Sequence, residues 1–419
     1  MRTVDEHRAA VAALLKPTPI ETRPLAEALG LVLAEELRAA VSLPPFDNSA
    51  MDGYAVRAAD VADATEAAPV RLPVTTDIPA GRTDHPTLAP GTAHRIMTGA
   101  PMPDGADAIV QVEHTDGGPP GGEVRIDRAV APGQHLRRAG EDVSAGELVL
   151  PAGVDLGAAR IGLAAAVGVA EVRVHRPARV LVLSTGSELV PPGKPLRHGQ
   201  IYESNGVMLA SAAREAGAVV EQLRFVPDDV PEFLAVLGER LGPGHEDGPV
   251  DLVLTSGGVS AGAYEVVKDA LAKRGVEFIR VAMQPGGPQG AGRLTRLAGP
   301  ASVKTQTADY PAVVTLPGNP VSSWVSFEVF VRPALRAAMG HPDSARPVVW
   351  ASLGEELRSP VGKRQFRRGT YDPSSNTVRT VGGPGSHLLS ALARANCLLI
   401  LPEETERHEV GNRVEVWLL

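Results

Sequence analysis

A short apolar run leads into a pair of glycines at Leu252-Val253-Leu254-Thr255-Ser256-Gly257-Gly258-Val259-Ser260. The apolar residues predict a buried strand, and residues 264 to 273 predict the helix that follows it. Adjacent glycines let backbone N–H groups approach a ligand closely, and the first turn of a helix favours anions. The turn is therefore either a plain strand-to-helix connection or part of a phosphate site.

Strands and helices alternate on both sides of this turn, from residue 178 to residue 340. This order predicts an α/β domain with a parallel sheet and helices on both faces. Ligands in such folds lie beyond the carboxyl ends of the strands, and polar turns follow Leu183, Leu254 and Leu316 at those ends. The predicted strands are Val180–Leu183, Ala218–Leu223, Leu252–Leu254, Val276–Val281 and Val313–Leu316, and the predicted helices are Gly206–Ala216, Val230–Leu241, Tyr264–Lys273 and Pro320–Met339.

The turn after Leu316 reads Pro317-Gly318-Asn319-Pro320. Proline suits the first turn of a helix, which places Pro320 at the start of the helix that follows. Together with the two glycines of the earlier turn, this segment could form the floor of a phosphate site. Ser322 lies in the first turn of the same helix and can donate a hydrogen bond to an oxyanion.

Acidic and polar residues follow other strands of the alternation. Glu188, after the first strand, could orient a metal ion or a water molecule. Asp228-Asp229 precedes a helix and is either an N-cap or part of a site. The polar run Tyr202–Asn205 also precedes a helix, and the same two interpretations apply to it.

An unusual mixture of residues occurs at Pro44-Pro45-Phe46-Asp47-Asn48-Ser49-Ala50-Met51-Asp52-Gly53-Tyr54-Ala55-Val56. Neither helix nor strand periodicity fits this mixture of carboxylates, amide, hydroxyl, tyrosine and apolar side chains. A polar ligand site needs such a combination, although its residue pairs also suit turns. From Pro44 to Asp142, short β-like runs broken by glycine and proline predict a mostly β lobe.

Helices are predicted on both sides of this lobe. Thr3-Val4-Asp5-Glu6 has the pattern of a capping box that opens a helix to about Leu15. A second short helix is predicted to end at Gly30, and another spans Leu156–Ala166. After residue 340 the pattern returns to short strands and turns, which predict a small β-barrel-like domain.

Four cations surround one aromatic residue in Lys363-Arg364-Gln365-Phe366-Arg367-Arg368. The segment is either a solvated basic face or a cradle for an oxyanion, because planar guanidinium groups suit bidentate contacts. Gly385-Ser386-His387 forms a second polar turn in the same region.

Composition narrows the class of protein. A chain of 419 residues suggests roughly two to four domains, and the net charge of −8 argues against a general nucleic-acid binder, which needs a basic face. The one cysteine, Cys397, lies in an apolar run and is expected to be a buried small hydrophobic residue. It allows neither a disulfide within the chain nor a Cys/His zinc cluster. Because neither a signal peptide nor a long apolar run is visible, we expect a soluble, cytoplasmic protein without membrane insertion.

The segment from residue 44 to residue 56 resembles the signature of the MoeA family, the molybdopterin molybdenumtransferases, which includes the E domains of gephyrin. The resemblance continues in the same order and spacing along nearly the whole chain. Further segments that match are Ile96–Ala100, Arg138–Val143, Ser184–Leu189, Thr255–Ser260 and Leu316–Pro320.

This resemblance implies a role in molybdenum cofactor biosynthesis. Members of the family bind adenylylated molybdopterin, insert molybdate and release AMP with Mg²⁺. The implied partners are a second copy of the chain and, beyond it, a molybdopterin adenylyltransferase and molybdoenzyme maturation factors. In the implied homodimer, which is elongated, the lobe of one subunit faces the α/β domain of the other.

The resemblance also implies a multidomain fold of the α/β plus β class. Residues 1–43 and 143–176 would form a discontinuous linker and dimerisation domain, and the mostly β lobe at 44–142 would be inserted into it. A MogA/MoaB-like three-layer α/β domain at 177–340 would bind molybdopterin, and a small β-barrel domain at 341–419 would follow.

Site residues are carried over from the family motifs by position. Catalytic roles are implied for Asp52, Thr98, Asp142, Glu188, Asp228 and Glu265, of which Glu188 and Glu265 are the implied metal ligands. Substrate binding is implied for Ser256, Gly257, Gly258, Ser260, Arg280, Pro317, Gly318, Asn319 and Pro320, and the molybdate end is implied at Ser322, Arg364, Arg368 and Ser386.

The chain departs from the family at Gln284 and Gly287. The family pattern there resembles Lys-Pro-Gly-Lys-Pro, whose two lysines are linked to molybdate binding, and only Arg280 keeps a cation nearby. Each lost ammonium removes a charged hydrogen bond of about 1.5–3 kcal/mol. The alternative function is therefore a gephyrin-like, non-catalytic scaffold on the same dimeric fold, with weak or no insertion activity. A molybdopterin adenylyltransferase is disfavoured because the loop of those proteins resembles Thr-Gly-Gly-Thr-Gly, whereas this chain has Ser256-Gly257-Gly258-Val259-Ser260.

Overall fold

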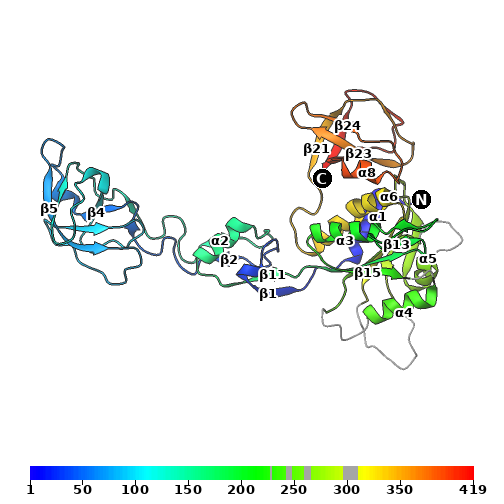
Figure 1. Cartoon of the computed structure of the whole chain (residues 1–419), viewed down its shortest axis with the longest axis horizontal. Coiled ribbons are helices and arrows are strands. Elements are labelled where there is room, and N and C mark those ends of the chain that lie inside the picture. The colour runs from blue at the N-terminus through cyan, green and yellow to red at the C-terminus, as the bar shows by residue number, and fades with distance from the viewer. Residues whose placement is uncertain (227–228, 242–247, 259–265, 296–309) are drawn as a thin grey trace.

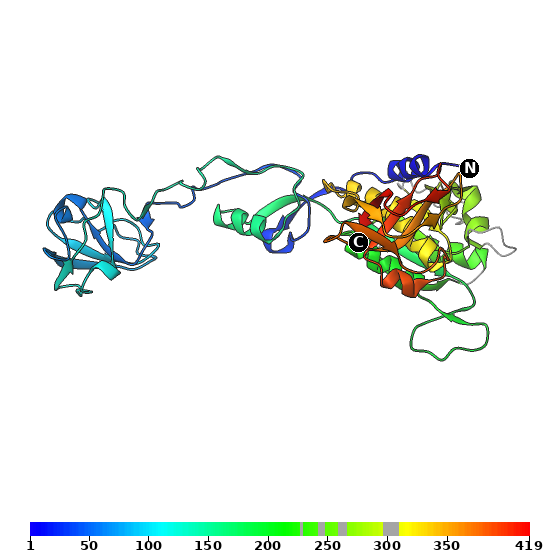
Figure 2. The same ribbon diagram turned by 90° about the horizontal axis from the view of Figure 1, so that it is seen from above.

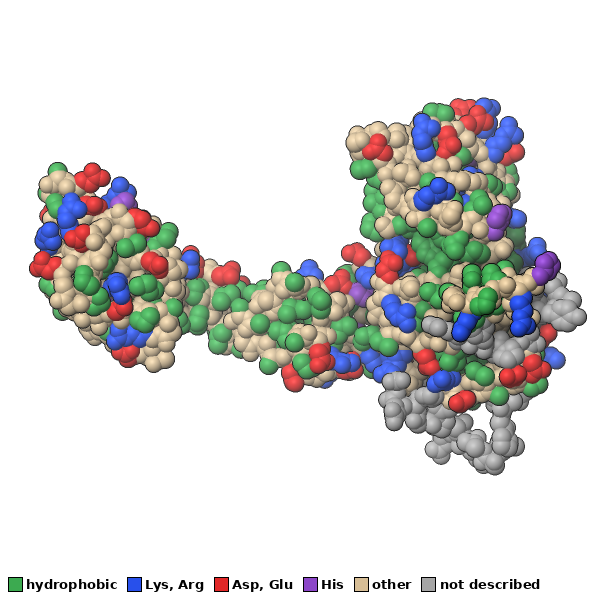
Figure 3. Space-filling view, in the orientation of Figure 1, with side chains coloured by type: hydrophobic (Ala, Val, Ile, Leu, Met, Phe, Trp, Pro, Cys, Tyr) green, Lys and Arg blue, Asp and Glu red, His purple; other side chains and the backbone are tan. Residues whose placement is uncertain are grey.

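The computed structural model describes residues 1–226, 229–241, 248–258, 266–295 and 310–419. The molecule is elongated, with a β lobe at one end, a small arm in the middle, and an α/β domain and a barrel at the other end (Figure 1). A narrow connection joins the lobe to the arm (Figure 3). Among the described residues, no helix is both long and apolar enough to cross a membrane.

The α/β domain is built on a mixed six-stranded sheet of order β15-β12-β16-β20-β19-β17. The strands β15, β12, β16 and β20 are parallel, whereas β19 runs antiparallel to both of its neighbours. Their bounds are β12 Arg179–Thr185, β15 Val219–Val226, β16 Leu252–Ser256, β17 Val276–Arg280, β19 Pro288–Arg293 and β20 Ala312–Leu316. A short parallel ribbon of β13 (Leu189–Val190) and β14 (Ile201–Tyr202) follows β12.

Helices cover both faces of this sheet, as predicted. On one face, α1, α3 and the α6–α7 segment share an apolar core with the sheet, and α4 and α5 share a second core on the other face. Their bounds are α1 Val4–Leu14, α3 Asn205–Glu215, α4 Val230–Arg240, α5 Val266–Leu271, α6 Pro320–Ser326 and α7 Arg332–Ala338, with a π-helical turn, η5, at Phe327–Val331 and a 3-10 turn, η4, at Ala272–Arg274. The capping box at Thr3 and Glu6 is present, and it opens α1 as predicted.

The prediction of an all-parallel sheet was wrong at β19. Its sequence contains Gly290 and Gly292 and lacks an apolar run, so it carries no strand signal. Close packing requires these glycines: a Cβ atom on Gly290 would lie 2.1 Å from Thr315 Oγ1, and one on Gly292 would lie 2.0 Å from the carbonyl oxygen of Gly275.

The arm consists of two antiparallel strand pairs and one helix. The strand β1 (Ile20–Pro24) pairs with β11 (Glu171–His175), and β2 (Leu37–Arg38) pairs with β10 (Leu148–Leu150). The helix α2 spans Ala158–Ala166. The short helix predicted to end at Gly30 is reduced to a single 3-10 turn, η1 (Leu25–Glu27), which follows β1 and ends three residues earlier. Pairing with a distant strand overrode a local pattern that was only about one turn long.

The lobe contains a five-stranded sheet of order β7-β4-β6-β5-β8 and a short pair, β3 with β9. This architecture agrees with the mostly β segment that was predicted. The bounds are β3 Asn48–Ser49, β4 Gly53–Val56, β5 Val70–Ile78, β6 Ala93–Ile96, β7 Ala108–Gln111, β8 Glu123–Ile126 and β9 Leu136–Arg137, with 3-10 turns η2 at Ala58–Val61 and η3 at Val112–His114.

The last part of the chain forms a small closed barrel. Its sheet order is β23-β24-β21-β27-β25, and β23 also pairs with β25 to close the ring. The bounds are β21 Val348–Leu353, β22 Leu357–Arg358, β23 Arg364–Asp372, β24 Thr377–Thr380, α8 Leu389–Ala393, β25 Cys397–Leu401, β26 Arg407–His408 and β27 Arg413–Leu418. One strand of the preceding region, β18 (Met283–Gln284), pairs with β23. Cys397 is fully buried as expected, and burial raises the pKa of its thiol to about 12. The α/β plus β, multidomain fold class is therefore confirmed, while the exact domain boundaries stay a prediction.

Candidate functional site

Three of the predicted site segments meet at the carboxyl ends of β12, β16 and β20. The register places Ser184, Ser256 and Leu316 side by side on neighbouring strands. The Asn205 side chain joins two of the turns, because its Nδ2 donates to Ser256 Oγ at 2.9 Å and to the carbonyl oxygen of Gly318 at 2.6 Å. The polar run at Tyr202–Asn205 therefore contributes to this arrangement through Asn205.

The backbone conformation after β16 requires glycine at two positions. Gly257 has φ +92° and Gly258 has φ +67°, a region that side chains other than glycine rarely adopt. A Cβ atom on Gly258 would also lie 2.8 Å from Val267 Cγ2. The Gly257 N–H donates to the carbonyl oxygen of Leu316 at 3.0 Å, and a Cβ atom on Gly318 would lie 3.6 Å from Gly257 Cα. The two predicted turns are thus in contact with each other.

The start of α6 is tied to the barrel. Asn319 Nδ2 donates to Ser386 Oγ at 2.9 Å, and the Val321 N–H donates to the Ser386 carbonyl oxygen at 3.0 Å. Pro320 occupies the first turn of α6, as predicted. These bonds place Ser386 beside the Pro317–Pro320 turn, although the two segments are far apart in the sequence.

Arg368 is buried and supports the turn that carries Ser386. Its side chain donates to the carbonyl oxygen of Gly385 at 3.2 Å and to that of Gly383. Burial lowers the pKa of this guanidinium. The sequence suggested either a solvated basic face or an oxyanion cradle. Arg368 is not on a solvated face, and the hydrogen bonds described above hold a backbone turn.

Positions 284 and 287 lie between α6 and the barrel. Gln365 Nε2 donates to Gln284 Oε1 at 2.7 Å, so a neutral amide pair occupies this place. A Cβ atom on Gly287 would meet its nearest atom, the carbonyl oxygen of Val281, at 3.5 Å, which is an ordinary contact. The loop is fixed against α6 by Gln289, whose Nε2 donates to the Gly286 carbonyl oxygen at 2.6 Å and to Ser326 Oγ at 2.7 Å.

Two further binding residues predicted near this loop have different surroundings. Ser322 is buried in the first turn of α6, and Arg280 is exposed at the end of β17, where its carbonyl oxygen accepts from the Arg2 N–H at 2.9 Å. Sequence reasoning did not identify Gln289. Its only signal is a polar residue in a glycine-rich segment, which is too weak to point to a site.

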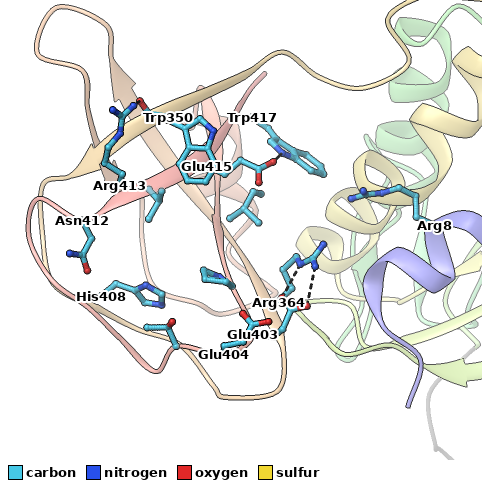
Figure 4. Close-up of a pocket in the computed structure, with 14 residues that line it drawn as sticks. Arg8, Trp350, Arg364, Glu403, Glu404, His408, Asn412, Arg413, Glu415 and Trp417 are labelled. Carbon is cyan, nitrogen blue, oxygen red and sulfur yellow. Dashed lines mark hydrogen bonds and ion pairs between the residues drawn. The ribbon is translucent and has the colours of Figure 1, made fainter.

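Arg364 is engaged by two carboxylates. Its guanidinium makes two hydrogen bonds to Asp5, at 3.0 and 2.9 Å, and two to Glu403, both at 3.0 Å. These charge-assisted bonds raise its pKa. Arg364 also lines a cavity of about 590 Å³ between α1 and the outer face of the barrel, together with Arg8 and the two tryptophans Trp350 and Trp417 (Figure 4). The structure therefore places Arg364 at the contact between α1 and the barrel.

Glu188 follows β12 and is exposed near the strand ends. Its carboxylate bends back over Gly186, since a Cβ atom on that glycine would lie 2.7 Å from Glu188 Oε2. A buried carboxylate lies close by: Glu203 Oε1 accepts from Ser184 Oγ at 3.0 Å and from the Gly206 N–H at 2.5 Å. Sequence reasoning included Glu203 only as one member of a polar run.

Some of the predicted residues lie outside the described part of the chain. These are Asp228, Ser260 and Glu265. Asp229, next to the first of them, is the N-cap of α4 and accepts from the Glu232 N–H at 3.0 Å. Among the described residues, no group of three or more His, Cys, Asp or Glu side chains is arranged to hold a metal ion.

The remaining predicted residues form a separate group in the lobe and its connection. Asp52 Oδ1 accepts from the Thr98 N–H at 2.7 Å and from Thr98 Oγ1 at 2.8 Å, and these bonds hold the pKa of Asp52 below its usual value. Asp142 is exposed where the lobe joins the arm. The lobe lies at the opposite end of the molecule from the strand ends (Figure 1). Within one chain, the two groups of predicted residues are therefore apart.

Family models match three segments that together cover most of the chain. The MoeA N-terminal region (domain I and II) matches residues 2–168, a probable molybdopterin binding domain matches residues 181–337, and the MoeA C-terminal region (domain IV) matches residues 351–419.

Relatives and solved structures match along the full length. Molybdopterin molybdenumtransferase 2 of Mycobacterium tuberculosis is 53% identical over 424 residues, covering 100% of this chain and 99% of the relative. Molybdopterin molybdenumtransferase 1 of the same organism is 38% identical over 443 residues, with the same coverage. The crystal structure of a molybdopterin biosynthesis MoeA protein from Pyrococcus horikoshii superimposes with a TM-score of 0.78 at 31% identity, covering 99% of this chain and 98% of that one.

Proposed function

Because the chain belongs to the MoeA family of molybdopterin molybdenumtransferases, we propose that it inserts molybdate into adenylylated molybdopterin and releases AMP. The full-length relatives support a role as a transferase in molybdenum cofactor biosynthesis. The main support for molybdate insertion is that three polar turns meet at the strand ends. Hydrogen bonds from the side chains of Asn205 and Asn319 join these turns.

The strand ends suit the phosphates of such a substrate. The Gly257-Gly258 turn has a backbone conformation that favours glycine, and α6 begins beside it with Pro320. Backbone N–H groups at such a place stabilise anionic oxygens without any rearrangement during the reaction. Ser256 and Ser386 add hydroxyl groups on two sides of the same region.

The molybdate end is proposed where the barrel meets α6. Arg368 and Ser386 keep their family positions here, and Ser322 lies in the adjoining turn. Arg364 plays a smaller part in this proposal than the sequence implied, because Asp5 and Glu403 already occupy its guanidinium.

Mg²⁺ fits the donors at the strand ends. This ion is commonly held by one or two carboxylates together with substrate phosphates and water, so it does not require a cage of protein ligands. Glu188 supplies an exposed carboxylate near the strand ends, and the ion would offset negative charge on the phosphates.

A homodimer would account for the separated residues in the lobe. Asp52 and Thr98 cannot act at the strand ends of their own chain, because the arm holds the lobe away from them (Figure 1). We propose that two chains associate so that each lobe completes the site of the other.

The test is AMP release from adenylylated molybdopterin by the purified protein with Mg²⁺, measured while molybdate is titrated. The proposal predicts release that depends on molybdate and yields active cofactor. An Asn319→Ala variant, which loses the bond to Ser386, should lower the rate, whereas Asn412→Ala, which loses one bond on an exposed barrel turn, should not. Tight substrate binding without molybdate-dependent release would contradict insertion and favour a scaffold.

A further inference from the structure

A ribbon leaves the α/β domain beside the proposed site. β13 and β14 form its base, residues 191–200 form its loop, and Figure 2 shows this green loop projecting from the domain. The ribbon begins directly after Glu188 and is followed directly by Glu203 and Asn205, which lie at the strand ends. Both of its ends are therefore anchored at the site.

The loop carries positive charge that no carboxylate of the described residues offsets. Lys194 and Arg197 are exposed, and the sequence contains no acidic residue between Leu189 and Tyr202. In the part of the chain that the structure describes, neither cation forms an ion pair. Arg176 and Arg346, by contrast, are paired with carboxylates.

The site beside this loop is poor in cations of its own. Gln284 and Gly287 carry no charge, Arg364 is paired with Asp5 and Glu403, and Arg368 is buried against carbonyl oxygens. The proposed substrate has a phosphoanhydride with several negative charges, which cations on a neighbouring element would help to neutralise.

The ribbon also exposes apolar residues that a bound ligand could cover. Leu196, Ile201 and Tyr202 are 43%, 54% and 44% exposed. Gly193 (φ +88°) and Gly199 (φ +84°) flank the two cations, have open space around them and have backbone conformations that favour glycine. The turn itself is held together, because Tyr202 Oη donates to the Lys194 carbonyl oxygen at 2.9 Å and the Arg197 N–H donates to Gln200 Oε1 at 2.9 Å.

We propose that the β13–β14 ribbon closes over the strand ends and that Lys194 and Arg197 bind the phosphates of the substrate. The inference rests on the proposed function, because the phosphoanhydride of that substrate is the anion that the ribbon meets.

The first test uses limited trypsin digestion of the wild-type protein, with ADP as the probe because it carries adenosine and a diphosphate. Trypsin cuts the Arg197–His198 bond in the exposed loop but is blocked at Lys194 by Pro195. Saturating ADP or adenylylated molybdopterin should slow cleavage at Arg197 by about tenfold or more, as expected for a segment that becomes ordered on binding. Cleavage after Lys273, at the opposite edge of the sheet, should not change. Equal cleavage at Arg197 with and without both ligands would overturn the proposal.

The second test compares two double variants that each remove two exposed cations. Lys194→Ala/Arg197→Ala should weaken ADP binding by about tenfold or more and reduce its dependence on salt, since each charge-assisted contact contributes severalfold. The control is Lys273→Ala/Arg358→Ala, which removes the same charge far from the strand ends and should bind ADP like the wild type. The exchanged variant Lys194→Arg/Arg197→Lys should retain most of the affinity.

These outcomes distinguish a failure of the ribbon proposal from a failure of the proposed function. If the wild type releases AMP and the ribbon variant matches the control in ADP affinity and KM, the ribbon inference fails and the function stands. If the wild type releases no AMP while ADP still protects Arg197 and the ribbon variant binds ADP weakly, molybdate insertion fails and the ribbon remains a phosphate-binding element.

Discussion

Position 284 shows how one residue changes the chemistry available at the site. Gln284 accepts a hydrogen bond from Gln365, and neither amide can neutralise a dianion. Gly287 leaves ordinary space for a side chain and does not have a left-handed backbone. Position 287 can therefore accept a Cβ atom and position 284 already carries a long side chain, so the charge of the proposed molybdate end can be changed at these two positions.

The variant Gln284→Lys/Gly287→Lys should bind molybdate more tightly. Two ammonium groups would add charge-assisted contacts, so the molybdate concentration at half-maximal AMP release should fall by about tenfold or more. The matched control is Thr370→Lys, which adds a cation on the exposed side of β23. An unchanged molybdate requirement in the double variant would show that these positions do not face the oxyanion.

His7 makes the stability of the protein depend on pH. The side chain is fully buried against Phe330, with ring centroids 4.6 Å apart, and burial lowers the pKa of His7 to about 4. Below pH 6.5 the unfolded chain takes up a proton that the folded chain refuses. The free energy of unfolding should therefore fall as the pH is lowered from about 6.5 to about 4, by on the order of 3 kcal/mol from this group.

Replacing the histidine removes this dependence. His7→Leu should flatten the loss of stability between pH 7 and pH 4, as measured by urea unfolding at a series of pH values. His387→Leu, at an exposed histidine, is the control and should keep the slope of the wild type. Identical slopes for His7→Leu and the wild type would mean that His7 takes up its proton at the same pH in the folded and the unfolded protein.

At the scale of elements, α1 links the α/β domain to the barrel. Its inner side packs in the same apolar core as the sheet and η5, while Asp5 reaches Arg364 on β23. Arg8 lies 5.7 Å from the centre of the Trp417 ring, which adds a second contact to the barrel (Figure 4). We therefore interpret Arg364 as a residue that holds these elements together.

This interpretation predicts different results for two neighbouring arginines. Arg364→Leu should lower the free energy of unfolding by about 1–3 kcal/mol, because Asp5 and Glu403 lose their partner, and should change the molybdate requirement less than about twofold. Arg368→Leu should raise the molybdate requirement strongly, because the Ser386 turn loses its support. Chemical unfolding and molybdate titration of both variants measure the difference. A large increase in the molybdate requirement of Arg364→Leu would instead show that Arg364 binds the oxyanion.

The sequence predicted those elements whose signals are local. The capping box of α1 and the buried strands before the polar turns belong to this group, and the strand ends followed from their order. The strand β19 was missed because its glycines serve packing against Gly275 and Thr315, which the sequence does not show. The pairing of Asp5 with Arg364 joins residues 359 positions apart and carries no local pattern.

At the scale of the whole molecule, the arm divides the candidate site residues into two groups. Asp52 and Thr98 are bonded to each other in the lobe, whereas Ser256, Asn319 and Ser386 gather at the other end (Figure 1). The sequence motifs predicted both groups but could not show how far the fold separates them. A second chain would reunite them, so activity should belong to the dimer rather than to the single chain.

Subunit complementation of molybdate-dependent AMP release is the decisive measurement. One chain would carry Asp52→Ala in the lobe, the other Asn319→Ala/Ser386→Ala at the strand ends, and the two would be mixed after reversible dissociation. Each variant alone should be nearly inactive. In the mixture, half of the dimers should be mixed and each of those should have one intact site of two, so about a quarter of wild-type activity should return. A mixture that remains as inactive as its components would contradict a site shared between two subunits.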